Sequence, residues 1–241
     1  MKFRLLSDLH LEFGEFTVPH MEDDSNTVLL LAGDIAVGKV KNYVEFLEDL
    51  GTRFRSVIYT PGNHEYYKGH LPKSWDKMKS LVSGIHMVNN EVVYVDDVAV
   101  IAATLWTDFN RHDFSAMMTA KEGMSDYRQI RARNYSRLNP QDTIKEHNNS
   151  VAFIFDTLLK LDCKTVVMTH HGPSFLSIHK DYEGDKYNPA YVSELGNKIL
   201  HNGPNFWVHG HVHNSMNYDI GDTTVLANPA GYPTKLGREN T

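Results

Sequence analysis

Five polar clusters in the chain contain the carboxylate, amide and imidazole side chains that bind divalent metal ions. In the first, Asp8 and His10 stand two residues apart, and residues i and i+2 of an extended chain point in the same direction. Both can therefore reach one ion. The second cluster is Gly33-Asp34, whose carboxylate can bridge two ions. Taken alone, each pair is more typical of a turn or a surface loop.

The other three clusters add an amide oxygen and several imidazoles. Asn63 and His64 follow a Pro-Gly turn, and His170 ends an apolar run. His211 and His213, again two residues apart, present parallel imidazoles, a geometry suited to a metal. A structural asparagine, a packed histidine or an incidental histidine cluster would explain each signal separately. Five such signals in one chain, each after an apolar run, are better explained by a common metal site.

The ligand types narrow the choice of metal. All the candidate ligands offer nitrogen or oxygen, and the chain has a single cysteine, Cys163. A structural zinc knot built on thiolates is therefore disfavoured, and an intramolecular disulfide is excluded. Mixed carboxylate and imidazole ligands suit Mn, Fe, Zn, Ni or Co and do not choose among them.

Short apolar runs precede the clusters, as buried strands that feed functional loops do. Helices are predicted between them, and the clearest begins at Pro140 with Asn139 as its N-cap. Strands joined by helices early in the chain and by turns late predict mixed sheets covered by helices, in one domain of residues 1–241. The predicted strands are residues 2–6, 28–31, 57–59, two within 91–104, 165–169, 206–208, 215–220 and 223–226, and the predicted helices are residues 40–50, 75–82, 190–200 and the one that begins at 140.

Composition and charge weigh against some partners. The 241 residues carry 24 Lys and Arg against 30 Asp and Glu, and the formal charge of -6 disfavours broad binding to nucleic acid or anionic membrane. The longest apolar run, Val28–Ala32, is far shorter than the ~20 residues that span a bilayer. The N-terminal residues lack the features of a secretory signal. We therefore expect a soluble, cytoplasmic protein.

An irregular, polar segment, residues 107–138, lies between two of the ligand groups. Arginine binds phosphate in a bidentate way and tyrosine can stack on a base, so the segment is a candidate lid over a nucleotide or a nucleic-acid end. The alternative is a solvated helix face with tyrosines in the core. The residues in question are Tyr127, Arg128, Arg131, Arg133, Tyr135 and Arg137.

The clusters together resemble the calcineurin-like metallophosphoesterase family. The resemblance implies an α/β fold of the α+β type, a four-layer α-β-β-α sandwich of two mixed sheets flanked by helices. It also implies metals at the C-terminal ends of strands. It rests on five blocks in the family's order, which are Asp8-x-His10, Gly33-Asp34, Gly62-Asn63-His64-Glu65, His170 and Gly210-His211-x-His213.

The same resemblance implies a role for each matching residue. Two divalent ions are expected, with Mn as the first choice and Fe, Zn, Ni or Co as alternatives. Asp34 would bridge the two ions, and His64 would be the catalytic histidine beside the leaving group. His171 and His209 lie outside the ligand pattern, and His209 either orients a ligand or packs within a strand. One ion would be held by Asp8, His10 and His213, and the other by Asn63, His170 and His211.

These roles imply a dinuclear metal-dependent phosphoesterase, which hydrolyses a phosphate mono- or diester by metal-activated hydroxide. A nucleotide is among the candidate substrates, nucleic acid stays open, and no oligomeric state is predicted. The alternatives are a nuclease related to DNA-repair exonucleases and a cyclic-nucleotide phosphodiesterase. Such nucleases usually carry an extra domain, whereas 28 residues follow His213. A non-catalytic scaffold, as in the retromer subunit that resembles this family, is least favoured because every matching position is filled, including His64.

Overall fold

The computed structural model describes residues 1–38, 43–132, 134–234 and 237–239. The first part of the chain alternates strands and helices, and the predicted strands 2–6, 28–31 and 57–59 are confirmed. The predicted helix 40–50 corresponds to α1, although Val40 lies outside the described residues. The elements are β1 (Lys2–Leu6), η1 (Asp24–Asn26), β2 (Thr27–Ala32), α1 (Tyr43–Arg53), β3 (Ser56–Thr60), η2 (His64–Tyr66), α2 (Lys73–Lys79) and β4 (His86–Met87).

The rest of the chain supplies a second set of strands and more helices than predicted. Residues 91–104 form the two adjacent strands expected there, and the strands near 165, 206, 215 and 223 are also confirmed. The elements are β5 (Glu91–Val95), β6 (Val98–Ala103), α3 (Phe109–His112), α4 (Phe114–Gly123), α5 (Asp126–Gln129), α6 (Pro140–Leu158), β7 (Lys164–Thr169), η3 (Phe175–Ser177), η4 (Lys180–Tyr182), α7 (Asn188–Tyr191), α8 (Gly196–Asn202), β8 (Phe206–His209), β9 (Met216–Ile220), β10 (Thr223–Ala227), β11 (Pro233–Thr234) and β12 (Gly237–Arg238).

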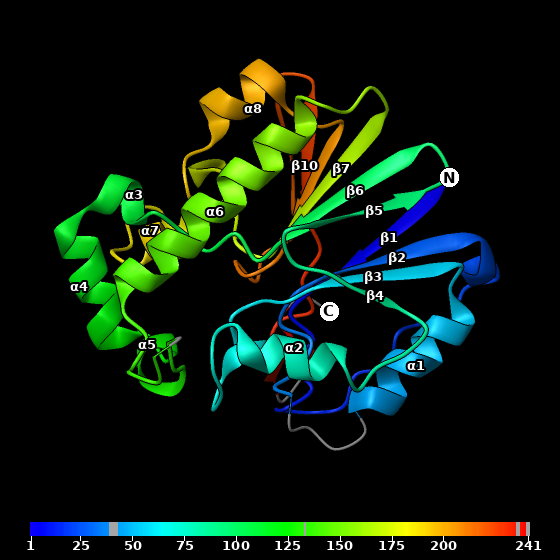
Figure 1. Ribbon diagram of the computed structural model, residues 1–241, viewed down its shortest axis with the longest axis horizontal. Helices are drawn as coiled ribbons and strands as arrows, with labels where there is room; N and C mark the ends of the chain where they lie inside the picture. Colours follow the sequence, from blue (N-terminus) through cyan, green and yellow to red (C-terminus); the bar gives the residue numbers. More distant parts are fainter. Residues whose placement is uncertain (39–42, 133, 235–236, 240–241) are drawn as a thin grey trace.

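Two sheets carry the fold, and helices cover the outer side of each (Figure 1). The first sheet has the order β1-β2-β3-β4, and its described strands are all parallel. The second has the order β5-β6-β7-β8-β10-β9 and is mixed, because β5 and β9 run antiparallel to their neighbours. The predicted sandwich of two main sheets flanked by helices is confirmed, with the mixed pairing confined to the second sheet.

Alternation along the central strands explains the layers. Val28 and Leu30 of β2 pack with Met168 of β7 in the apolar cluster between the two sheets. Leu29, between them in sequence, belongs with Leu47 of α1 to the cluster on the outer side. Successive residues of a strand face opposite sides, so a strand that is apolar at every position needs cover on both faces. The uninterrupted apolar run of β2 therefore requires a sheet on one side and a helix on the other.

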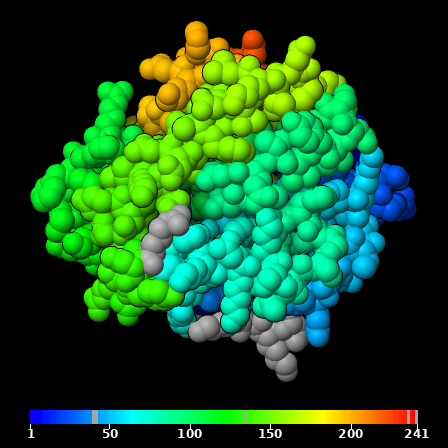
Figure 2. Space-filling view, viewed as in Figure 1, coloured from blue at the N-terminus to red at the C-terminus, as the bar shows by residue number. Residues whose placement is uncertain are grey.

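The helix α6 covers the outer face of the second sheet and begins where the sequence predicts. The Asn139 side chain accepts a hydrogen bond from the Gln141 amide at 3.0 Å, and the Asp142 carboxylate accepts one from the Asn139 amide at 3.0 Å. This capping box satisfies amides that the first turn leaves unpaired, with Pro140 beside it. Figure 2 shows α6 (yellow-green) crossing the molecule and meeting the green segment of α3–α5.

None of the helices in the described ranges is both long and apolar enough to cross a membrane.

The predicted helix 190–200 is wrong as a single element, because α7 and α8 are separated by an extended stretch. There the Ser193 amide donates to the Gly172 carbonyl at 3.0 Å, and the Leu195 amide donates to the Pro173 carbonyl at 2.9 Å. These bonds join the stretch to the loop that follows β7, so its amides do not form the hydrogen bonds of a continuous helix. The predicted helix 75–82 also begins two residues earlier and ends three residues earlier, as α2.

Residues 107–138 are more regular than the polar composition suggests. Asp113 caps α4 by accepting a hydrogen bond from the Ala116 amide at 2.8 Å. The short element α3 is a left-handed turn, since the φ angles of Phe109–His112 lie between 51° and 65°. Such angles cost roughly 1–2 kcal/mol per residue. The packing of Phe109, which is buried, holds this turn in place.

Candidate active site

The predicted site residues lie together just beyond the C-terminal ends of strands from both sheets, where most of them are buried. Carboxyl ends of parallel strands are the usual place for a site in such sheets. The first sheet contributes loops after β1, β2 and β3, and the second contributes loops after β7 and β8. The residues brought together are Asp8, His10, Asp34, Asn63, His64, His170, His211 and His213.

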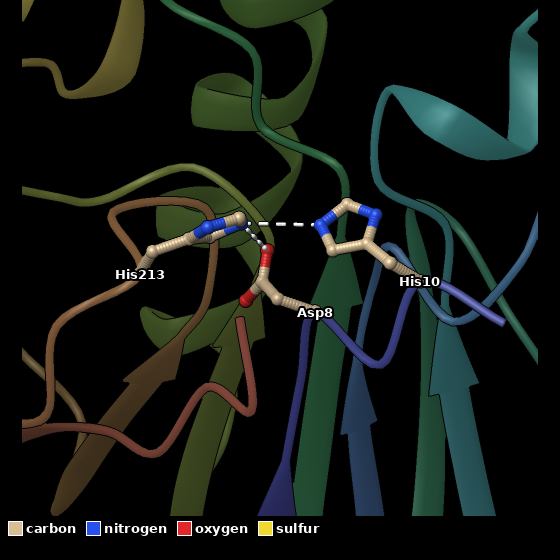
Figure 3. A group of neighbouring side chains, drawn as sticks. All are labelled: Asp8, His10 and His213. Atoms are coloured by element: carbon tan, nitrogen blue, oxygen red, sulfur yellow. Dashed lines mark hydrogen bonds and ion pairs between the residues drawn. The ribbon is translucent and has the colours of Figure 1, made fainter. Parts of the chain in front are cut away.

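One group consists of Asp8, His10 and His213, whose side chains point toward one another (Figure 3). His213 Nε2 lies 3.4 Å from Asp8 Oδ1 and 3.1 Å from His10 Nε2. Asp8 and His10 are fully buried. The other ring nitrogen of His213 lies 2.8 Å from Glu239 Oε2, which orients the imidazole. The three ligand atoms are close enough to hold one metal ion.

A second group surrounds His170. Its Nδ1 lies 2.9 Å from the Ala32 carbonyl oxygen, so this nitrogen donates and the Nε2 of a neutral ring presents a lone pair. That Nε2 lies 3.0 Å from Asn63 Oδ1, 3.1 Å from His211 Nδ1 and 3.4 Å from Asp34 Oδ1. Several acceptors thus face one point. Such an arrangement repels itself unless a cation or a shared proton lies between them, so the residues fit a divalent ion.

Asp34 is the residue that reaches both groups. Its Oδ1 faces His170, and its Oδ2 lies 3.9 Å from His10 Nε2. The His64 amide donates to Oδ1 at 2.9 Å and holds the carboxylate in this orientation. A side chain at Gly62 would collide with the same carboxylate, which explains why glycine stands there. The position matches the bridging role that the resemblance implies.

The pKa shifts in the metal-free chain also indicate a cation site between His170 and Asp34. Burial lowers the pKa of His170, but the Asp34 carboxylate has the larger, opposite effect, and the pKa rises to about 10. Burial raises the pKa of Asp34, yet the charges of His170 and His64 hold it well below its usual range. Burial and the neighbouring His171 lower the pKa of His211. In the absence of metal, a proton on His170 occupies the place that a cation would take.

His64 stands beside these groups in a different environment. Its Nδ1 donates to Glu12 Oε1 at 2.6 Å, its ring stacks on Tyr67 with centroids 4.1 Å apart, and its Nε2 lies 3.8 Å from Asp34 Oδ2. Burial lowers the pKa of His64, but Asp34 and Glu12 raise it to about 9. In the metal-free chain the imidazole is therefore charged at neutral pH and can donate a proton.

Glu12 is a site residue that the sequence reasoning missed. The same Oε1 that binds His64 lies 3.3 Å from His10 Nδ1, so one carboxylate orients both histidines. Burial raises the pKa of Glu12, but the bonds from His10 and His64 lower it to about 2. Glu12 lies in the same polar loop as Asp8 and His10, and this closeness in sequence is the signal that could have revealed it.

Five residues of the site hold backbone angles that L-amino acids rarely adopt. The strain amounts to roughly 1–2 kcal/mol for each of them. Bonds between loops impose these angles; the His10 amide donates to the Asp34 carbonyl at 3.0 Å, and the His211 amide donates to Asp8 Oδ2 at 3.0 Å. The residues are Asp8 (φ 55°), His10 (φ 45°), Asp34 (φ 55°), His211 (φ 69°) and His213 (φ 50°).

Glu65 holds two of these loops together. Its buried carboxylate accepts hydrogen bonds from the amides of Gly62 at 2.6 Å, Ile35 at 2.8 Å and Asp34 at 3.1 Å, and from the Tyr59 hydroxyl at 2.5 Å. Burial and the Asp34 charge raise the pKa of Glu65 to about 7, although the Tyr59 bond opposes them. Glu65 belongs to the block Gly62-Asn63-His64-Glu65, but the sequence alone did not show that it links the loops after β2 and β3.

Glu65→Gln is expected to lower the free energy of unfolding by about 1–3 kcal/mol, because the amide nitrogen cannot accept and leaves a buried donor unpaired. Urea denaturation measures the change. Glu45→Gln, on the exposed side of α1, is the matched control and should stay within ~0.5 kcal/mol of the parent chain. Equal stability of the Glu65 variant and the control would show that the carboxylate does not hold the loops.

His171 and His209 are buried and serve the surroundings of the site. His171 Nδ1 lies 3.1 Å from the Thr104 carbonyl oxygen, and burial lowers its pKa to about 3. His209 Nε2 lies 2.8 Å from Ser177 Oγ, and burial lowers its pKa to about 4. Both histidines are therefore neutral. His209 packs at the end of β8, directly before the loop that carries His211.

A cavity of about 690 Å³ opens beside the two groups. Residues 123–126 line it, so part of the predicted lid segment does reach the site. Neither Tyr127 nor Arg128 is among the residues that line it. Tyr127 is buried with its hydroxyl 3.2 Å from Thr143 Oγ1, which agrees with the alternative that the tyrosines lie in the core. Arg128 donates to the Gly123 carbonyl at 2.9 Å. Arg133 lies outside the described residues.

The chain belongs to the calcineurin-like phosphoesterase family, whose model matches residues 1–215. The resemblance inferred from the five blocks is therefore confirmed. Together with the histidine and aspartate groups, family membership supports a metal-dependent phosphoesterase, a hydrolase of the metallophosphoesterase type.

Similar proteins span nearly the whole chain. Uncharacterized protein L509 of Acanthamoeba polyphaga mimivirus is 28% identical over 259 residues, which cover 95% of this chain and 90% of that protein. The structure of phosphopantetheinyl hydrolase from Mycobacterium tuberculosis matches with a TM-score of 0.66 and 18% identity, over 96% of this chain and 90% of that chain. A putative 5'-nucleotidase from Staphylococcus aureus matches with a TM-score of 0.50 and 15% identity, over 99% of this chain and 49% of that chain. Both structures share the fold.

Proposed function

We propose that the chain hydrolyses a phosphate ester with the help of two divalent metal ions. The observation that carries the proposal is the convergence of buried nitrogen and oxygen lone pairs from both sheets on two adjoining points. Mn is the first choice of metal, with Fe, Zn, Ni or Co as alternatives. One ion is assigned to Asp8, His10 and His213 and the other to Asn63, His170 and His211, with Asp34 shared between them.

The bound ions would supply Lewis acidity and lower the pKa of water near the phosphate. The chain's own residues set the charge around them. Two divalent ions carry four positive charges and the carboxylates of Asp8 and Asp34 return two, so the loaded site attracts an anion. Asn63 contributes an uncharged oxygen, which preserves this positive balance.

His64 completes the proposal as the acid. Glu12 accepts a hydrogen bond from His64 Nδ1, which favours the protonated imidazole, and the stack on Tyr67 fixes the plane of the ring. A proton donated to the departing oxygen removes the charge that develops there when the ester bond breaks. Glu12 would act through His64, by holding Nδ1 so that Nε2 points to the cavity.

Monoester and diester substrates, a nuclease and a cyclic-nucleotide phosphodiesterase are all compatible with this machinery. A scaffold without activity is disfavoured because His64 and each candidate ligand are present and positioned together. The single domain over residues 1–241 and the cytoplasmic location stay predictions of the sequence.

Metal removal and restoration tests the proposal. The protein is treated with chelator, supplied with Mn, Fe, Zn, Ni or Co singly, and assayed with p-nitrophenyl phosphate and bis-p-nitrophenyl phosphate. We expect hydrolysis only after a metal is restored, and the better ester identifies a monoesterase or a diesterase. Turnover that survives chelation, or an absence of turnover on phosphate esters with every metal, would contradict the proposal.

A further inference from the structure

The cavity beside the candidate metal groups has aromatic walls. Tyr67, Tyr182, Tyr187, Tyr191 and Tyr232 all line it. Two of these rings adjoin proposed ligands. Tyr191 lies 4.7 Å from the ring of His211, and Tyr232 lies 4.4 Å from the ring of His10. An organic group attached to a phosphate at the metals would therefore meet flat aromatic surfaces on both flanks.

Apart from its imidazoles, the charged residues of the cavity are acidic. Besides Asp34, the lining includes the carboxylates of Asp126, Asp185 and Glu239, and no lysine or arginine occurs among its described residues. Positive charge is thus concentrated at the proposed ions and at His64 beside them. A second phosphate on the substrate, further along the cavity, would face carboxylates without a cation to pair with.

Asp126 is the most unusual of these carboxylates. It begins α5, is 3% exposed and yet lines the cavity. The Tyr67 hydroxyl donates to Asp126 Oδ2 at 3.4 Å, which is a long contact, and the Asn63 side chain also forms a hydrogen bond with this carboxylate. No lysine or arginine of the described ranges forms an ion pair with it. A carboxylate has about four acceptor sites, so Asp126 can accept N–H or O–H donors of a ligand in addition to Tyr67 and Asn63.

We infer that the cavity selects a phosphate ester with one phosphate and a flat aromatic organic group whose donors bond to Asp126. The inference rests on the proposed function for the position of the phosphate. Substrates with a second phosphate near the organic group, nucleic acid among them, are disfavoured by the acidic lining. Asp126 is in this view a specificity determinant, while His64 and the metal ligands perform the hydrolysis.

Matched substrates test the inference on the metal-loaded protein. Adenosine 5'-monophosphate and ribose 5-phosphate both release the primary 5-hydroxyl of a ribose and differ by the aromatic base. We expect kcat/KM to be roughly 5- to 150-fold higher for the nucleotide, the range that stacking of one base supports. Adenosine 3',5'-bisphosphate adds one phosphate to the same nucleotide and should be at least about fivefold poorer than it.

Two variants test whether the charge of Asp126 causes the preference for one phosphate. Asp126→Asn keeps the shape of the side chain and removes its charge, so the difference between the bisphosphate and the monophosphate should shrink. Asp162→Asn, exposed and outside the cavity lining, should leave that difference unchanged. The comparison of substrates on the unsubstituted chain holds even if the Asp126 variant does not fold.

Calorimetry with chelator-treated protein supplies a readout that needs no metal. Adenosine should produce a binding heat, and ribose at the same concentration should not. Equal kcat/KM for the nucleotide and ribose 5-phosphate, with no adenosine binding, would overturn the inference and leave the proposed function standing. Preferential adenosine binding without hydrolysis of any ester would support the selectivity and contradict the proposed function.

Discussion

Asp34→Asn is expected to remove metal binding and turnover together. Asparagine preserves the size of the side chain and can still accept the bond from the His64 amide. It lacks the charge that lies between His170 and His10, the central residues of the two candidate groups. Loss of an outer partner of a metal ligand typically costs 10–100-fold in affinity or activity, so loss of a shared ligand should cost at least about 100-fold in kcat/KM.

Metal content per chain, measured by mass spectrometry after dialysis, and steady-state kinetics test this expectation together. The matched control is Asp96→Asn, an exposed position whose carboxylate pairs with Arg55 far from the site. The control should retain both the metal and the activity. An Asp34 variant that keeps full metal content and full turnover would show that the carboxylate is not shared by the two ions.

His64→Ala is expected to separate metal binding from turnover. We predict that kcat falls by about 10²–10⁴-fold, the contribution of a positioned acid, while the metal content stays at that of the parent chain. The loss should be smaller for a nitrophenyl ester than for an alkyl ester, because nitrophenolate departs without a proton. His20→Ala, at an exposed position, is the control and should change neither quantity.

The same role of His64 predicts the direction in which the rate changes with pH. His64 must carry its proton to act as an acid, so the rate should fall as the pH rises through its pKa. That pKa is about 9 in the metal-free chain, and nearby cations will lower it. The falling limb should be absent from the alanine variant. Reduced metal content in this variant would instead make His64 a ligand, as its closeness to His10 and Asp34 permits.

The residues that face one another in the site could be predicted because their signals are local. Asp8 with His10, and His211 with His213, are separated by two positions, and each pair follows a strand that ends at the same edge. Apolar runs and the polar residues that follow them are features that a single sequence displays. The extended backbone expected for these pairs was wrong, because the φ angles of Asp8, His10, His211 and His213 lie between 45° and 69°. Sheets covered by helices followed from the same apolar runs, since the run Val28–Ala32 of β2 requires cover on both faces, whereas the four-layer sandwich was implied by the family resemblance.

The parts that could not be predicted depend on contacts between distant segments. Glu12 and Glu65 gain their roles from partners that other loops bring to them, His64 for the first and Ile35 for the second. The break within residues 190–200 arises because the loop after β7 uses the backbone there. The arginines near residue 128 resemble a phosphate-binding group in sequence, yet Arg128 faces the end of α4. No local pattern reveals such pairings.

The proposed ligands come from both sheets, four from the loops after β1, β2 and β3 and three from the loops after β7 and β8. A bound pair of ions would therefore act as a cross-link between the two halves of the sandwich. Because an unfolded or half-folded chain lacks one side of each group, binding would favour the docked state, by about 2.7 kcal/mol when free metal is 100 times its dissociation constant. Activity would then require complete folding. A chain whose two sheets are not packed against each other would be both less stable and inactive.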